Sequence, residues 1–166
     1  ILDLFEALVG ARLLYGFFQV GGTRYDIPDD WAQKCLETVN LIDSRIDEYQ
    51  QMLEQNAFFL ARAKGVGIIS RDLAEDVGIA GPLLRGSGIN WDLRRHAPYS
   101  SYEDFDFRVP VETDGDCYAR YRVRMAEFRQ AIAIVRQALD KLPSGPISSR
   151  PALKSVAQIR IPKGEA

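Results

Sequence analysis

The chain has 166 residues, of which 46% are hydrophobic and 27% are charged, and its formal net charge at pH 7 is -2. This composition is that of one globular domain and excludes a disordered chain. Nucleic-acid binders are usually strongly basic, so the charge also argues against a nucleic-acid partner. The two cysteines, Cys35 and Cys117, and the single histidine, His96, exclude a disulfide scaffold and a tetrahedral Cys/His zinc site.

Segments that would direct the chain to a membrane or anchor it there are not apparent. No run approaches the roughly 18–20 consecutive apolar residues that a membrane span needs, and no basic stretch opens a signal peptide. The chain begins at Ile1 inside an amphipathic pattern and ends at Ala166 without a stop signal. We therefore expect a fragment of a longer protein, truncated at both ends, with no transmembrane segment.

Two helices are predicted in the first third of the chain. Apolar residues recur at helical spacing over Ile1–Tyr15, with Gly16 as the expected end and Gly21-Gly22 as a firmer break. A proline and two aspartates then precede a second helix, expected over about residues 30–54, and its extension as far as Lys64 is left open.

The middle of the chain predicts one short helix followed by a long loop. Ser70 is a suitable N-cap for a helix over Arg71–Val77, and Gly78 is suited to its end. Residues 81–114 show no helical periodicity and are rich in glycine and aromatic residues, with Phe107–Val109 as a candidate short strand.

A third long helix is predicted after this loop, with Asp116 as its N-cap and Pro143 as its stop. Residues 29–54 carry mainly acidic charges, whereas residues 116–142 carry mainly basic ones. We interpret the two long helices as an antiparallel pair packed through apolar stripes. A basic surface on the third helix that docks a partner or anionic lipid headgroups is the alternative. The residues expected to be buried are Trp31, Val39, Ile42, Ile46, Tyr121, Met125, Phe128, Ile132 and Val135.

The expected fold class is mainly α, built on two long amphipathic helices with shorter helices and a Gly/Arg-rich central loop. Residues 1–142 are expected to form the helical core. Residues 143–166 hold four of the eight prolines and are expected to form an extended connection to a missing region. A structureless run of that length is unusual within a complete compact domain.

Outside the central loop, the residues that could carry chemistry are better explained by structural roles. The run from Gly65 to Ser70 lacks the third glycine and the preceding strand of a dinucleotide fingerprint, so NAD binding is not expected there. His96 fits a loop-packing role, and Cys35 lies on an apolar stripe. Cys117 occupies a helix N-terminus that favours a thiolate, but neighbouring aspartates oppose it. We assign no catalytic residue and no metal ligand.

The segment richest in candidate groups is Gly81–Arg95, with the sequence GPLLRGSGINWDLRR. Glycines permit close backbone approach, and arginines supply planar, permanently charged guanidinium groups. One interpretation is a loop tied internally by Asp92. The other is a surface that places arginines beside an anionic or electron-rich cofactor held elsewhere. The candidates for a cofactor-adjacent site or subunit interface are Arg85, Ser87, Asp92, Arg94 and Arg95.

This segment, continued by Pro98, Tyr99 and Tyr102, resembles the D subunit of NADH:quinone oxidoreductase, respiratory complex I, which is related to the large subunit of nickel–iron hydrogenases. Further stretches agree along nearly the whole chain. They are Leu2–Glu6 with Gly10-Ala11-Arg12, Gly21-Gly22 with Asp26-Ile27-Pro28, Gly65-Val66-Gly67, Gly115-Asp116 with Arg120, Arg124 with Glu127, and Pro162–Ala166.

The resemblance implies a hydrogenase-large-subunit-like fragment of an oxidoreductase and translocase of electron transport. It implies a peripheral-arm subunit on the cytoplasmic side of the inner membrane that supports the quinone cavity. The neighbouring subunit would hold the terminal 4Fe-4S cluster, NADH would react on other subunits, and this chain would bind no cofactor itself. The family's quinone-headgroup histidine and tyrosine lie upstream of Ile1, and His96 does not match that histidine. The isolated fragment is therefore expected to be inactive and to bind neither metal nor NAD.

Other assignments are left open. A subunit of a photosynthetic NDH-type complex and a hydrogenase-like subunit of a related membrane complex are two of them, although Cys35 and Cys117 do not match the CxxC pairs of nickel ligation. A free-standing helical interaction module without redox function is the third. We also expect exposed, partner-facing apolar patches around Ile1–Phe18 or Gly81–Tyr102.

Overall fold

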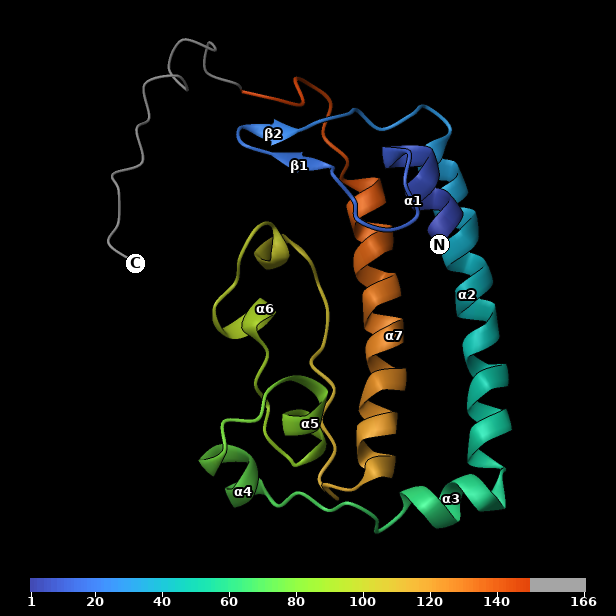
Figure 1. The fold of residues 1–166 in the computed structure, drawn as a ribbon, viewed down its shortest axis with the longest axis vertical. Coiled ribbons are helices and arrows are strands. Elements are labelled where there is room, and N and C mark those ends of the chain that lie inside the picture. Colours follow the sequence, from blue (N-terminus) through green and yellow to red (C-terminus); the bar gives the residue numbers. More distant parts are fainter. Residues whose placement is uncertain (150–166) are drawn as a thin grey trace. The chain divides into compact units, whose positions relative to one another are not determined.

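The computed structural model describes residues 1–149, and helices dominate them (Figure 1). The fold class expected from the sequence, mainly α, is confirmed. The chain divides into two compact units, one of Ile1–Leu36 with the described residues from Leu142 onward, and one of Glu37–Lys141. The Pro162–Ala166 stretch and most of the expected connection lie outside the described residues.

The first unit begins with helix α1, Leu2–Val9, which ends well before the predicted Tyr15. Gly10 has a φ of 75° and its N–H donates to the Glu6 carbonyl, so it ends the helix in a left-handed conformation that glycine adopts at little cost. The Trp31 indole nitrogen donates to the Leu4 carbonyl at 2.8 Å and thereby ties α1 to the first turn of the next helix.

A two-stranded antiparallel hairpin follows, formed by β1 (Phe18–Gln19) and β2 (Gly22–Thr23). Gly21 and Gly22, predicted as a break, have φ of 90° and 146° at its turn. A Cβ atom on Gly22 would lie 2.2 Å from the Ile147 carbonyl oxygen, so glycine is required where the chain crosses the hairpin. Strands of two residues carry too little alternation to be predicted from sequence.

Helix α2, Trp31–Glu54, starts in the first unit and continues into the second, close to its predicted bounds. The extension to Lys64, which the sequence left open, does not occur. Asn56 interrupts the helix and caps a separate one, α3 (Ala57–Ala63), because its side chain accepts from the amides of Phe58 and Phe59.

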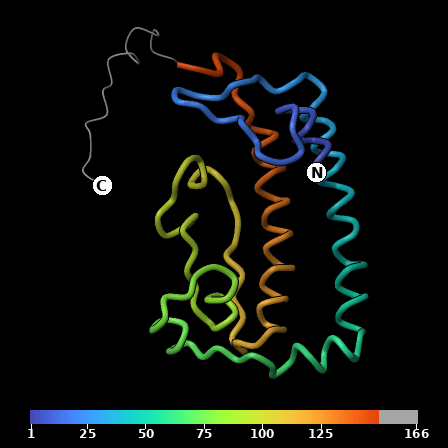
Figure 2. Tube along the Cα trace, in the orientation of Figure 1, coloured from blue at the N-terminus to red at the C-terminus, as the bar shows by residue number. Residues whose placement is uncertain are grey.

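Helix α7, Cys117–Asp140, has the predicted N-cap, since the Asp116 carboxylate accepts from the Ala119 amide at 2.7 Å. From Glu37 onward, α2 runs antiparallel to α7, as interpreted from the sequence (Figures 1 and 2). Two arginines of α7 bridge the pair. Arg129 reaches Asp47 at 2.6 Å, and Arg136 reaches Asp43 at 2.8 Å.

The predicted burial of the two apolar stripes is correct for only part of the residues. Those that are buried are Val39, Ile46, Met125 and Ile132. Those that are only half-buried are Trp31, Ile42, Tyr121 and Val135. Phe128, with 51% of its surface exposed, was assigned wrongly.

The reason is that α7 is covered on two faces. Ala119 and Val123, outside the predicted stripe, are 0% exposed. Helical periodicity places them on the face of Gln130 and Gln137, whose side-chain oxygens each accept a backbone amide of residues 106–108 at 2.8 Å. Phe128 lies at the edge of the α2-facing stripe and contributes to neither buried face.

The expected loop over residues 81–114 contains short helices. Helix α4 (Arg71–Asp76) precedes it, capped at Ser70 as predicted. The elements that follow are α5 (Gly81–Gly86), α6 (Leu93–His96) and the 3₁₀ turn η1 (Tyr102–Asp104). Residues 107–109 form no strand. Helices of three to six residues contain too little of a helical period to be detected in sequence.

Candidate functional site

The candidate site is built on α5, on α6 and on the middle of α7, all within the second unit. Arg85 of α5 is only 5% exposed. Its guanidinium donates to the Trp91 carbonyl at 3.0 Å and to the Glu127 carboxylate of α7. It also lies 3.6 Å from the Asp92 carboxylate. A buried cation therefore joins the short helices to the long one.

Asp92 completes this network from the other side. As the N-cap of α6 it accepts from the Arg94 amide at 3.0 Å, and from Nε and Nη2 of the Arg94 guanidinium at 3.0 and 2.6 Å. Burial by itself would raise the pKa of Asp92, but the hydrogen bonds and charge of Arg94 and the charge of Arg85 outweigh it and lower that pKa. The carboxylate therefore stays ionised, and the internal tie expected of Asp92 is present.

Ser87 and Gly86 hold this segment against the backbone at Ile69 and against α7, respectively. The buried Ser87 hydroxyl donates to the Ile69 carbonyl at 2.8 Å. A Cβ atom on Gly86 would lie 2.9 Å from Cγ of Arg120, so glycine allows α5 to approach α7 this closely. Ser87 therefore holds the segment in place.

Arg95 differs from these buried groups. Its side chain is 36% exposed, and its guanidinium lies 4.2 Å from the centre of the Phe107 ring and 3.8 Å from the Asp106 carboxylate. The Arg94 side chain is only 22% exposed, and two of its guanidinium nitrogens donate hydrogen bonds to the Asp92 carboxylate. Of the arginines in the segment, Arg95 is the one best placed to face a partner.

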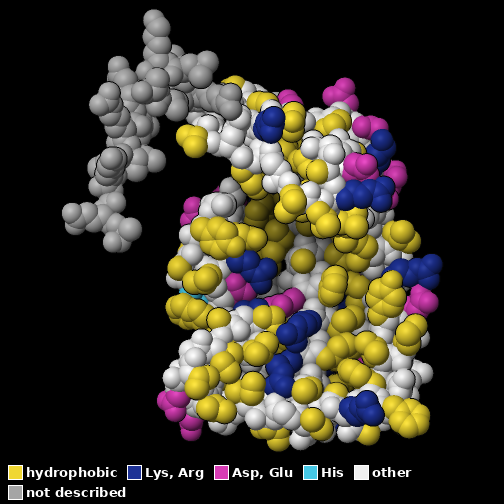
Figure 3. Space-filling view, in the orientation of Figure 1, with side chains coloured by type: hydrophobic (Ala, Val, Ile, Leu, Met, Phe, Trp, Pro, Cys, Tyr) yellow, Lys and Arg dark blue, Asp and Glu magenta, His cyan; other side chains and the backbone are white. Residues whose placement is uncertain are grey.

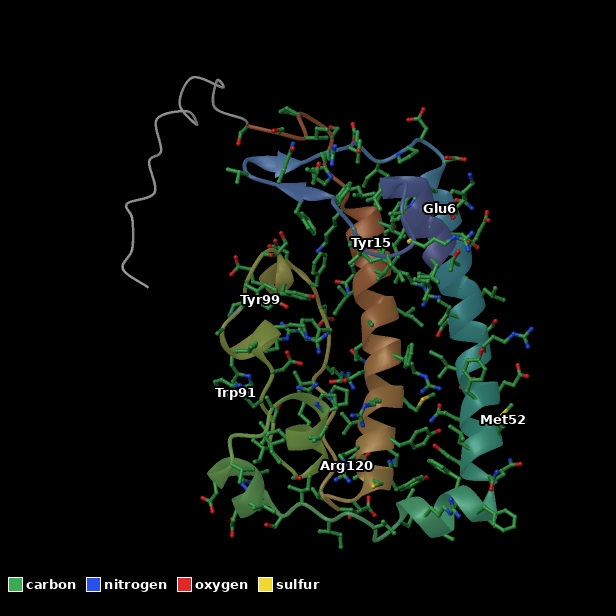
Figure 4. The ribbon with its side chains drawn as sticks, in the orientation of Figure 1. Glu6, Tyr15, Met52, Trp91, Tyr99 and Arg120 are labelled. Atoms are coloured by element: carbon green, nitrogen blue, oxygen red, sulfur yellow. The ribbon has the colours of Figure 1, made fainter. Side chains whose placement is uncertain are left out.

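Apolar side chains on both sides of α6 are exposed. Trp91, Leu93 and Tyr99 expose 44%, 58% and 54% of their surface. Figure 4 places Trp91 and Tyr99 before and after α6, at the edge of the second unit. His96 stacks on Trp91 with ring centres 4.5 Å apart, which fits the loop-packing role expected of it. Grouped apolar side chains on a protein surface commonly mark interaction sites.

A cavity of about 420 Å³ lies among these elements. Its lining residues are Ala80, Gly81, Arg85, Trp91, Asp92, Leu93, Arg94, Tyr99 and Glu127. Figure 3 shows basic and acidic side chains beside one another on this face of the molecule. The role of Glu127 was missed, although it belongs to the stretches that carry the resemblance, because its partner Arg85 lies 42 positions away.

The described residues offer no metal centre. Within 1–149, no group of three or more His, Cys, Asp or Glu side chains is arranged to hold a metal ion. Cys35 and Cys117 are free and belong to different units, and burial raises the pKa of the Cys35 thiol. In the same part of the chain, no helix combines the length and the apolar character needed to cross a bilayer.

Comparison with known proteins points to one family. Residues 1–163 match the family described as respiratory-chain NADH dehydrogenase, 49 Kd subunit. The D subunit of NADH-quinone oxidoreductase from Desulforamulus reducens is 44% identical over the whole chain. The H subunit of NAD(P)H-quinone oxidoreductase from Synechococcus sp. strain JA-3-3Ab is 41% identical, also over the whole chain. The D 2 subunit of NADH-quinone oxidoreductase from Rhizobium etli is 46% identical over 88% of the chain. These matches cover 44%, 48% and 36% of the relatives, so the chain spans less than half the length of each.

Proposed function

The chain belongs to the family of the 49 Kd subunit of respiratory-chain NADH dehydrogenase, and we propose that it is part of the quinone-site subunit of a proton-translocating NADH:quinone oxidoreductase. It lies in the peripheral arm of that complex, on the cytoplasmic side of the inner membrane. It supports the quinone cavity and docks the subunit that holds the terminal 4Fe-4S cluster, while NADH is oxidised on other subunits. The observation that carries the proposal is the family match along residues 1–163.

Within the complex, the Gly81–Arg95 segment and the nearby Tyr99 supply the docking surface. Its shape is set internally by the buried Arg85 and Asp92, so little conformational freedom is lost when a partner binds. The exposed side chains of Trp91, Leu93 and Tyr99 supply apolar and aromatic area of the kind enriched at the centres of interfaces. The neighbouring subunits of the complex are therefore the partners of this surface.

Arg95 gives the docking surface an exposed positive charge. A guanidinium keeps its proton at any accessible pH, so Arg95 acts through its charge and not as an acid or base. The cluster belongs to the neighbouring subunit in this proposal. A cation held close to a redox centre favours the reduced form and raises the potential of that centre.

The test is a redox titration of the terminal cluster in the intact complex that carries Arg95→Met. Methionine keeps much of the side-chain volume and removes the charge, so we expect a lower potential, slower quinone reduction and normal assembly on native gels. For a one-electron couple, ~59 mV corresponds to a tenfold change in equilibrium. Arg136→Met is the matched control, because Arg136 is paired with Asp43 of α2. If the cluster potential and the turnover of the Arg95→Met complex are unchanged, the proposed electrostatic role of Arg95 is wrong.

A subunit of a photosynthetic NDH-type complex is the second candidate. It is favoured by the Synechococcus relative, which is nearly as similar to the chain as the Desulforamulus reducens relative. Both candidates use the same docking surface, and the names of the two relatives differ in the electron donor, which is NADH for one and NAD(P)H for the other. Quinone reduction by the purified complex with NADH but not with NADPH would support the respiratory assignment, and quinone reduction with NADPH as well would support the second.

A further inference from the structure

The positive charge of α7 is only partly neutralised within the described residues. The arginines of this helix that form ion pairs are Arg122, Arg129 and Arg136. Within residues 1–149, Arg120 and Arg124 form none. The Arg120 guanidinium donates to the carbonyls of Gly115 and Gly67 at 2.6 and 2.9 Å, and the Arg124 guanidinium donates to the Arg120 carbonyl at 3.2 Å. Asp116, whose charge interacts with that of Arg120, is already occupied as the N-cap of the helix.

These two arginines lie one turn apart, on the face of α7 between the sides that contact α5 and α2. Arg120, Arg124 and Phe128 follow one another at intervals of four residues, so helical periodicity places them along one line. Arg124 is exposed, and Phe128 exposes 51% of its surface. Figure 4 places Arg120 beside α7, and Figure 3 shows basic side chains near hydrophobic ones on this face of the molecule.

This line of side chains selects the chemistry of what covers it. Like charges one turn apart on a helix repel each other, and a carboxylate between them relieves the repulsion. Guanidinium groups also match the planar geometry of a carboxylate. Phe128, in the next turn, adds exposed apolar surface. An amphipathic segment that carries a carboxylate at one end of its apolar face satisfies both parts of the line.

The layering of the second unit favours a protein segment over a lipid surface. Helix α5 contacts one side of α7, and α2 is joined to another side by two ion pairs, so the three helices lie side by side (Figure 1). Domains bury their apolar surface between at least two packed layers. A second layer of chain over Phe128 would supply the layer that is missing from residues 37–141.

The carboxylate is expected from a part of the subunit beyond this sequence. Residues 150–166 are a poor source, because they contain four basic side chains and one acidic side chain, Glu165. The chain covers 44%, 48% and 36% of three relatives, so more than half of each relative lies outside the matched stretch. A segment of the same polypeptide is held close to its docking site at high effective concentration.

We propose that Arg120 and Arg124 form a receptor for a carboxylate on an amphipathic segment of the same subunit, from outside residues 1–166. The carboxylate pairs with the two guanidinium groups, and the apolar side of the segment packs on Phe128. This segment takes the place of the anionic lipid headgroups considered for the basic surface of the helix. The inference goes beyond the proposed function, since it concerns packing within the subunit and not the docking of its neighbours.

The direct test is the structure of the full-length subunit in its intact complex by electron cryo-microscopy. We expect an Asp or Glu oxygen of the same subunit within about 4 Å of a guanidinium nitrogen of Arg124. A carboxylate of another subunit, a phospholipid headgroup or no anion at this position would each overturn the inference. If the expected carboxylate is found but the complex does not reduce quinone, the proposed function fails and this inference stands.

Alkylation of Cys117, followed by peptide mass spectrometry, measures the cover in solution. Cys117 is half-buried and lies three residues before Arg120 on the same face, so a segment packed there shields its thiol. In the full-length subunit, Arg124→Glu repels the carboxylate and should raise the alkylation rate about tenfold, equivalent to about 1.4 kcal/mol. A nearby negative charge alone would raise the thiol pKa and slow the reaction, so the direction of the change separates the two effects.

Two controls accompany this variant. Arg62→Glu makes the same charge change at an exposed arginine of α3 and should leave the alkylation rate of Cys117 unchanged. The buried Cys35 reports general unfolding and should stay slow. If both thiols react faster, Arg124→Gln, which removes the charge without reversing it, decides the matter. No increase at Cys117 in Arg124→Glu, or a wild-type rate in Arg124→Gln, would overturn the inference.

Discussion

Two ionic networks of the same residue types lie on opposite sides of α7 and differ in burial. On the α5–α6 side, Arg85 and Asp92 have side chains that are 6% and 5% exposed. On the α2 side, Arg136 and Asp43 have side chains that are 39% and 37% exposed, and their contact of 2.8 Å is shorter than the 3.6 Å between Arg85 and Asp92. Distance alone therefore does not predict which pair matters more for stability. Because solvent screens only the second pair, removing one member should be costly in the first network and nearly neutral in the second.

The largest effect is expected for Asp92→Ala. It leaves the buried Arg85 and the half-buried Arg94 with one carboxylate fewer, so the free energy of unfolding should fall by about 3–5 kcal/mol. Chemical denaturation followed by circular dichroism measures the loss. Asp47→Ala, at a side chain that is 79% exposed, is the control. Similar losses in the two variants would abolish the distinction between the networks.

The next effect concerns the apolar contacts on the α2 side. Ile132→Ala should cost about 2–5 kcal/mol through lost transfer energy and a residual cavity, because Ile132 is buried. Phe128→Ala should cost less than about 1 kcal/mol, because half of Phe128 already faces solvent. Denaturant midpoints of the two variants measure this difference. A larger loss at Phe128 than at Ile132 would mean that α7 is rotated from the orientation described here.

A smaller effect is expected from acid. The folded-state pKa of Asp92 is lowered, so its contribution to stability is complete above the unfolded aspartate pKa of about 3.9 and is lost as pH falls through the folded value. Between pH 7 and 5 this contribution should stay constant. Unfolding free energies of the wild type and Asp92→Asn should therefore be separated by a constant amount over that range and converge below about pH 4. A separation that already shrinks between pH 7 and 5 would contradict the lowered pKa.

The smallest effect is expected for Arg136→Met. The pair with Asp43 is partly exposed, so its loss should change the free energy of unfolding by less than about 1 kcal/mol. The change should shrink further in concentrated salt, which screens exposed charges. Urea titrations at low and high salt make the comparison. A loss above about 2 kcal/mol would place this pair with the buried network.

The long helices could be predicted because their signals are local and repeated. The apolar period of α2 and α7, the Asp116 cap and the opposite charges of the two helices all lie within single stretches of sequence. The end of α1 was predicted too late because apolar spacing continued past Gly10, where the backbone turns left-handed. The error at Phe128 has a different origin, since periodicity locates a stripe but does not show that a second face of the helix is buried.

The candidate site was predicted only in part for a related reason. Asp92 and Arg94 are two positions apart, and their contact follows from the local turn that begins α6. The contact of Arg85 with Glu127 joins residues that are 42 positions apart, and no local sequence pattern predicts it. Helices as short as α5 and α6 depend on tertiary contacts, since α5 packs against α7 and α6 packs against η1, so the loop interpretation was the natural one for an isolated segment.

Gly81–Arg95 is proposed to form a docking surface whose shape is set before the partner binds, and amide hydrogen exchange tests this proposal most directly. The amides of Arg94, Arg95 and His96 donate to Asp92. We expect them to be protected already in the chain alone, and the amides from Trp91 to Tyr99 to exchange still more slowly in the assembled complex. Exchange at the rate of an unstructured peptide in the chain alone, or no change on assembly, would contradict the account.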